Sequence, residues 1–142
     1  MQQLIQQETE AIHPVAIESE SDIVTVRKAA RDAAEAIGFG ITDVTRIVTA
    51  TSELARNIFL YAGSGIMQWR RLNTGGAIGI ELKFEDNGPG ITNIEQAMEG
   101  GYSTSGGLGL GLHGAKRLMD EMEINSQVGQ GTIVTIKKWL KR

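Results

Sequence analysis

The stretch FEDNGPGITNIEQAMEGGYSTSGGLGLGLHGAKRLMD, residues 84–120, decides the fold, and it contains two clusters of glycine. The first cluster, Gly88 and Gly90, follows Asp86 directly. The second leads into apolar residues at helical spacing, and its members are Gly106, Gly107, Gly109 and Gly111. A glycine-rich loop that opens a helix presents free backbone N–H groups and the positive end of the helix dipole, which both attract phosphate. The stretch therefore predicts a nucleotide site.

Length and composition predict a single domain over residues 1–142, with residues 1–12 as a flexible lead-in. The hydrophobic fraction of 41% and the charged fraction of 22% are typical of a globular protein. The chain has no cysteine, which excludes disulfides, thiolate zinc sites and cysteine nucleophiles. The net charge of -3, the polar start and the absence of a long apolar run favour a cytoplasmic protein that binds neither nucleic acid nor membrane.

Hydrophobic periodicity and turn residues predict the order of helices and strands. Helices are expected over 23–37 (capped by Ser21 or Asp22), from Thr42 or Asp43 to 62, over 93–98, and from the second glycine cluster to 122. Strands are expected over 14–17, 66–72, 77–85, 124–128 and 132–140, with a hairpin turn at 73–76. This mixture indicates an α+β fold in which one mixed sheet is covered by helices on one face.

The second long helix carries Glu53 and Asn57 four residues apart, so the two side chains lie on one face beside the apolar stripe. A carboxylate can accept a proton, and an amide oxygen can bind a hard cation such as Mg²⁺. An ordinary polar pair on a solvated helix face has the same spacing, and the pair taken alone favours that interpretation.

Asp86 ends an apolar strand and begins Asp-Asn-Gly-Pro-Gly. A carboxylate at this place can accept a hydrogen bond from an exocyclic amine such as adenine N6. The same residues also form turns readily, so the residues alone leave both interpretations open.

Other patterns have plainer interpretations. Residues 109–114 spell GxGxxG, but no strand precedes them and no acidic residue ends the following strand, so a dinucleotide fold is disfavoured. His13 and His113 have no partners at metal-ligand spacing and are expected to be structural. The basic residues near the end of the chain are expected on a solvated strand edge, and they are Lys137, Lys138, Lys141 and Arg142.

The order of these motifs resembles the N, G1, G2 and G3 boxes of the GHKL (Bergerat-fold) ATPases and kinases. The order is Glu-x-x-x-Asn on a helix, Asp-x-Gly-x-Gly, a glycine-rich loop before a helix, and Gly131-Thr132. The resemblance covers residues 14–142 and implies a two-layer sandwich with a mainly antiparallel sheet and an ATP lid loop. The runs TSELARNIFLYAG (51–63), EDNGPGI (85–91) and GYSTSGGLGLGLHGAKRLMDE (101–121) are similar to the compact serine/threonine kinases that phosphorylate STAS-domain proteins.

The resemblance implies roles for particular residues. Asn57 would bind the Mg²⁺ of Mg-ATP, and Glu53 would be the general base for the acceptor hydroxyl. Asp86 would bind adenine N6, supported by Thr132 through a water, and Gly88 and Gly90 would let the loop pass close to the base. The lid around the triphosphate would comprise Gly106, Gly107, Leu108, Gly109, Leu110 and Gly111.

The resemblance also implies partners. These are STAS-domain scaffold or antagonist proteins as phosphoacceptors and a PP2C-type phosphatase that the kinase activates by binding. Some members of this branch hold a sigma factor directly, so an anti-sigma factor is the alternative function. The residues themselves do not decide whether water or a protein hydroxyl attacks the γ-phosphate, and Arg56 has no assigned role.

Overall fold

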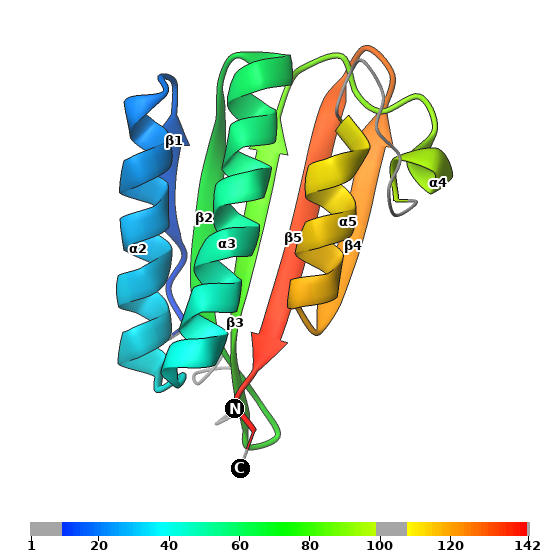
Figure 1. Ribbon diagram of the computed structural model, residues 1–142. Coiled ribbons are helices and arrows are strands. Elements are labelled where there is room, and N and C mark those ends of the chain that lie inside the picture. The colour runs from blue at the N-terminus through cyan, green and yellow to red at the C-terminus, as the bar shows by residue number, and fades with distance from the viewer. Residues whose placement is uncertain (1–9, 99–107, 142) are drawn as a thin grey trace.

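The computed structural model describes residues 10–98 and 108–141, which form one sheet with helices on one face (Figure 1). The elements in chain order are β1 (His13–Ile17), α2 (Ser21–Ile37), α3 (Ile41–Asn57), the π-helical turn η1 (Ile58–Ala62), β2 (Gly65–Thr74), β3 (Ala77–Asp86), α4 (Ile94–Ala97), α5 (Leu108–Leu118), β4 (Glu121–Gln127) and β5 (Gly131–Trp139). The expected lead-in lies mostly outside the described residues, and near its end Glu10 forms an ion pair with Arg71 at 2.8 Å.

The sheet has five strands in the order β1-β2-β3-β5-β4, and every neighbouring pair is antiparallel. The α+β class and the placement of α2, α3 and α5 on one face are confirmed (Figure 1). No parallel pair occurs among the described strands, so the sheet is antiparallel throughout. In the part of the chain that the structure describes, no helix combines the length and the apolar character needed to cross a bilayer.

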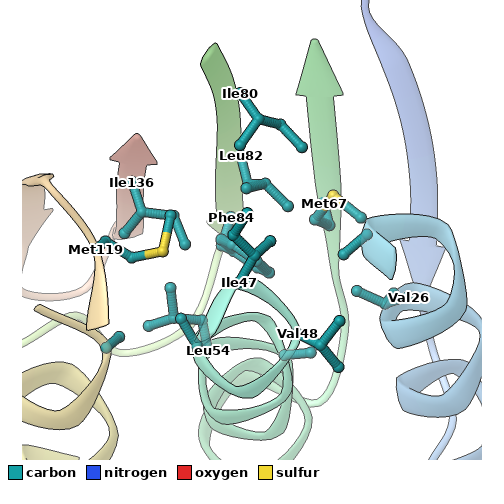
Figure 2. Packing of buried hydrophobic residues seen from close by; sticks show 14 of the residues in the cluster. Val26, Ile47, Val48, Leu54, Met67, Ile80, Leu82, Phe84, Met119 and Ile136 are labelled. Atoms are coloured by element: carbon teal, nitrogen blue, oxygen red, sulfur yellow. The ribbon is translucent and has the colours of Figure 1, made fainter. Parts of the chain in front are cut away.

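The core lies between the sheet and the three long helices (Figure 2). Alternate residues of β3 point toward the helices, and Ile80, Leu82 and Phe84 are buried there. The stripe expected on the second long helix is buried as predicted, and it comprises Val44, Ile47, Thr51, Leu54 and Ile58. Burial of each of the four apolar side chains in this stripe contributes about 1.5–3 kcal/mol, so the stripe fixes which face of α3 is left for the site.

The helix starts differ from the sequence-based expectation. The N-cap of α2 is Glu20, and Asp22 instead accepts hydrogen bonds from the backbone N–H groups of Glu18 and Ser19, at 2.8 and 3.1 Å. The N-cap of α3 is Gly40, while Asp43 pairs with Arg46 at 3.0 Å. Both predicted caps were wrong. The carboxylates of Asp22 and Asp43 interact with other groups and do not accept hydrogen bonds from the first N–H groups of their own helices.

Two further boundaries also differ. The helix predicted to continue through residue 62 does so, but after Asn57 it changes to the π-helical turn η1. α5 ends at Leu118 and not at residue 122, because β4 begins at Glu121 and pairs with β5. The hairpin turn consists of Gly75 and Gly76 alone, both at positive φ (58° and 90°), as a two-residue turn requires.

The expectation that Lys138 is solvated was wrong. Lys138 pairs with Ile80 in the sheet register, which places its side chain on the helix face, and it is only 4% exposed. Lys137, the preceding residue, faces the open side of the sheet and lies 3.8 Å from Glu81. The alternation of β5 therefore separates two adjacent lysines into two environments.

Candidate functional site

The end of α3 and the start of α5 lie at the same end of the sheet (Figure 1). Residues from both helices line a cavity of ≈ 110 Å³. Its lining combines apolar side chains with a few polar ones, as is typical of a small-molecule site. The lining residues are Leu54, Asn57, Ile58, Tyr61, Ala62, Phe84, Asp86, Pro89, Gly90, Ile91, Leu112, Thr132 and Val134. Three of the polar residues expected at a nucleotide site, Asn57, Asp86 and Thr132, therefore share one cavity.

Asp86 is the carboxylate of the cavity. Its Oδ1 accepts a hydrogen bond from the backbone N–H of Gly88 at 2.8 Å, which is the contact of a turn-forming aspartate. No described residue donates to its Oδ2, so one carboxylate oxygen remains for a donor on a ligand. The turn interpretation and the ligand-acceptor interpretation are thus compatible, with one oxygen for each.

The glycines of the first cluster pack against the protein itself. A Cβ at Gly88 would lie 2.6 Å from the Cβ of Ala62 in η1. Gly90 has φ +79°, and a Cβ there would overlap the carbonyl oxygen of Gln127. Gly90 lines the cavity, whereas Gly88 does not. Glycine is therefore required at both positions for the loop to fit between η1 and the β4–β5 turn.

Ser126 holds this corner together, and the sequence analysis missed it. Its Oγ accepts from the backbone N–H of Ile91 at 2.8 Å and donates to the carbonyl oxygen of Gly131 at 3.1 Å. It also lies 2.8 Å from Oγ1 of Thr132. Because a hydroxyl has one proton, Thr132 is the donor in that last contact. A serine in a strand is too common to be a signal, and only the pairing of Ser126 with Thr132 in the β4–β5 register reveals it.

Asn57 and Gly111 meet at the junction of α3 and α5. A Cβ at Gly111 would lie 2.7 Å from Nδ2 and 3.2 Å from Oδ1 of Asn57. Gly111 thus brings the backbone of α5 against the side-chain amide that lines the cavity. Gly106 and Gly107 lie outside the described residues. Leu108, Gly109 and Leu110 form the first turn of α5, whose backbone N–H groups point toward this end of the molecule.

Glu53 lies one helical turn before Asn57 on α3 and is half-buried. It is not among the residues that line the cavity, and within residues 10–98 and 108–141 it forms no hydrogen bond or ion pair. Its carboxylate therefore has no partner among the described residues. Arg56 is exposed on another face of the helix.

The remaining singled-out residues are structural. The ring of His13 stacks on Trp69 with the ring centroids 4.2 Å apart. Nδ1 of His113 lies 3.0 Å from the carbonyl oxygen of Met98, which joins α5 to the end of α4. Neither histidine lines the cavity.

Comparison with known proteins places this chain in a family. The family described as "Histidine kinase-like ATPase domain" matches residues 17–138. The serine/threonine-protein kinase RsbT of Bacillus subtilis (strain 168) is 51% identical over 127 residues, which cover 89% of this chain and 96% of that protein. The anti-sigma F factor of Thermoanaerobacter sp. (strain X514) is 32% identical over 106 residues, which cover 70% of this chain and 73% of that protein.

Solved structures agree on the fold. A chain of the SiaB-SiaC complex from Pseudomonas aeruginosa superposes with a TM-score of 0.53 at 12% identity, over 96% of this chain and 97% of that chain. The histidine kinase AdeS of Acinetobacter baumannii superposes with a TM-score of 0.50 at 19% identity, over 99% of this chain and 74% of that chain. The resemblance to the GHKL kinases is confirmed: the chain belongs to the histidine kinase-like ATPase family, among its serine/threonine-protein kinase members.

Proposed function

We propose that this kinase transfers the γ-phosphate of ATP to a serine or threonine of a STAS-domain regulatory protein in a partner-switching stress pathway. One observation carries the proposal: Asn57, Asp86 and Thr132 line a single cavity, and Glu53 lies one helical turn before Asn57. The chain is also 51% identical to RsbT. We further propose that the protein acts in the cytoplasm and afterwards activates a PP2C-type phosphatase by binding it.

The residues of the cavity suit the adenosine end of ATP. The apolar walls formed by Ile58, Phe84 and Leu112 would hold the flat base away from water. Oδ2 of Asp86, which has no donor among the described residues, would accept from the exocyclic amine of the base. Thr132, held in place by Ser126, would support that contact through a water.

The start of α5 suits the phosphates, because the first N–H groups of a helix have no partner within it. The side-chain oxygen of Asn57 would be the protein ligand of Mg²⁺, which neutralises phosphate charge when bound. Among the described residues no three histidine or acidic side chains cluster as a metal site. The donor set therefore fits an Mg²⁺ ion that arrives with the nucleotide and is held mainly by its phosphates.

Glu53 would take the proton from the acceptor hydroxyl as its oxygen attacks the γ-phosphorus. The bond between that phosphorus and the β,γ-bridging oxygen breaks, and ADP leaves. The products are a phosphoserine or phosphothreonine on the partner and ADP. Positioning and charge neutralisation by the site account for most of the acceleration in such transfers.

The test is a transfer assay with γ-labelled ATP and Mg²⁺ against each STAS-domain protein of the source organism. We expect label on one or more of these proteins with the wild-type kinase and none in the absence of Mg²⁺. Release of labelled inorganic phosphate without labelled protein would contradict the proposal and indicate an ATPase.

An anti-sigma factor remains the second candidate, and the 32% identity with anti-sigma F factors supports it. A pull-down with this protein from lysate of the source organism separates the two functions. Capture of STAS-domain proteins or a PP2C-type phosphatase supports the first, and capture of a sigma factor supports the second.

A further inference from the structure

We infer that Lys138 is a positioning residue for the nucleotide site and acts on it through α5. The inference rests on the proposed binding of ATP at the cavity, but not on the identity of the phosphoacceptor. Lys138 lies at the end of the molecule opposite the cavity, where β5 ends, α5 ends and α3 begins (Figure 1).

The ammonium group of Lys138 joins three elements. Nζ donates a hydrogen bond to the carbonyl oxygen of Leu118, the last residue of α5, at 2.9 Å. It lies 3.5 Å from Oδ1 of Asp120, which follows α5, and 3.9 Å from Oδ1 of Asp43 in the first turn of α3. A cation at this place satisfies a C-terminal carbonyl of α5 and interacts favourably with the negative end of its dipole.

A buried lysine is not the residue that would stabilise the folded protein most at this position. Removing an ammonium group from water is unfavourable, and apolar residues of similar size often stabilise such sites as well or better. Val134 and Ile136, the preceding helix-facing residues of β5, are apolar and buried. The lysine instead fixes the position of the end of α5, because its hydrogen bond and its two carboxylate partners are directional contacts that an apolar side chain cannot make.

α5 needs such an anchor. It has 11 residues, of which Gly109, Gly111 and Gly114 are three, and both short length and glycine disfavour an isolated helix. α3 and α5 lie side by side and run in opposite directions (Figure 1). The anchored end of α5 therefore fixes the position of its other end, where Gly111 lies against Asn57. A slip of one residue along the helix is about 1.5 Å and would separate these two groups.

The test compares Lys138→Met, which keeps length and removes charge, with Lys138→Arg and with Lys137→Met. We expect Lys138→Met to weaken ATP binding about 10-fold or more, because apparent affinity falls in proportion to the fraction of molecules in which α5 is correctly placed. Turnover at saturating ATP should stay close to wild type, because the bound state restores the junction. Lys138→Arg should recover most of the affinity, and Lys137→Met, on the open face of the same strand, should bind ATP as wild type does.

Amide hydrogen exchange distinguishes a specific effect on α5 from a general loss of stability. In Lys138→Met we expect faster exchange in α5 with unchanged protection in α2 and in α3 beyond its first turn. Uniform loss of protection, or unaltered ATP affinity in a folded Lys138→Met protein, would overturn the inference. If Lys138→Met fails to fold, Asp120→Asn removes one carboxylate partner and should shift ATP affinity in the same direction by a smaller factor; no shift would overturn it.

The outcomes separate this inference from the proposed function. A wild-type protein that binds ATP but labels no STAS-domain protein would refute the proposed phosphoacceptor. The role of Lys138 could still be tested by comparing ATP affinity in the wild type and in Lys138→Met. A wild-type protein that does not bind ATP would refute both.

Discussion

Gly111 lies against the side-chain amide of Asn57 so closely that a Cβ at position 111 would come within 2.7 Å of Nδ2. The contact joins the helix that ends at the cavity to the helix that begins there. Because the atom in the way is the end of a side chain, an added methyl group would displace the amide and leave both helices in place.

We therefore expect Gly111→Ala to fold and to bind Mg-ATP more weakly, by about 10-fold or more, because the amide oxygen would be displaced from its proposed place as a metal ligand. Isothermal titration with Mg-ATP measures this. Gly114→Ala is the matched control, because a Cβ there would have no described atom within 4 Å apart from its chain neighbours and the nearby backbone of its own helix. It should bind ATP normally and raise the free energy of unfolding by about 0.5–1 kcal/mol, the usual gain of alanine over glycine in a helix. Equal affinities in the two variants would contradict the prediction.

Glu53 should separate ATP binding from phosphate transfer. Glu53→Gln keeps the shape of the side chain and removes its basicity, so transfer should fall by roughly 10²–10⁴-fold while ATP affinity stays nearly constant. Single-turnover transfer and equilibrium binding measure the two quantities. Glu123→Gln, a change on the outer strand β4, should alter neither. Full activity of Glu53→Gln would remove Glu53 from its assigned role.

Asp86→Asn tests the free carboxylate oxygen. The amide Oδ1 can still accept from the N–H of Gly88, so the turn should persist. With its oxygen kept on Gly88, the amide turns its NH₂ group, a donor, toward the donor on the base, and the charge assistance is lost, so ATP should bind more weakly. The loss should be greater for ATP than for an analogue without the exocyclic amine. Equal losses for the two nucleotides would leave Asp86 with the turn alone.

Ser126→Ala removes the hydroxyl that three groups share. The backbone N–H of Ile91 and the hydroxyl of Thr132 lose their acceptor, and the free energy of unfolding should fall by about 1–3 kcal/mol. Urea denaturation measures this change, and ATP affinity should fall with it because Ile91 and Thr132 both line the cavity. Ser64→Ala, on an exposed residue between η1 and β2, is the control. A variant as stable as wild type would show that water replaces the hydroxyl.

The sequence predicts most of this fold because its signals are local. The apolar stripe of α3 and the hairpin turn between β2 and β3 each depend on signals within a few residues, and the structure confirms them. Asn57, Asp86 and Thr132 were predicted from motif order, and the structure brings all three to one cavity.

What the sequence could not predict depends on pairing across the fold. Ser126 matters because β4 pairs with β5 in one register, and Lys138 is buried because β5 pairs with β3 in one register. A shift of one residue would turn either side chain to the opposite face. The π-helical turn after Asn57 likewise has no local signal, since its sequence IFLYA suits an ordinary helix.

The walls of the cavity come from stretches far apart in the chain: residues 54–62, 84–91, 112 and 132–134. Partial unfolding of any one of these stretches would therefore disrupt the site, so a bound nucleotide favours the intact chain over every form in which one of them is open. A ligand at 100 times its dissociation constant adds about 2.7 kcal/mol to the free energy of unfolding. Resistance of the purified protein to proteolysis should consequently rise with the concentration of Mg-ATP.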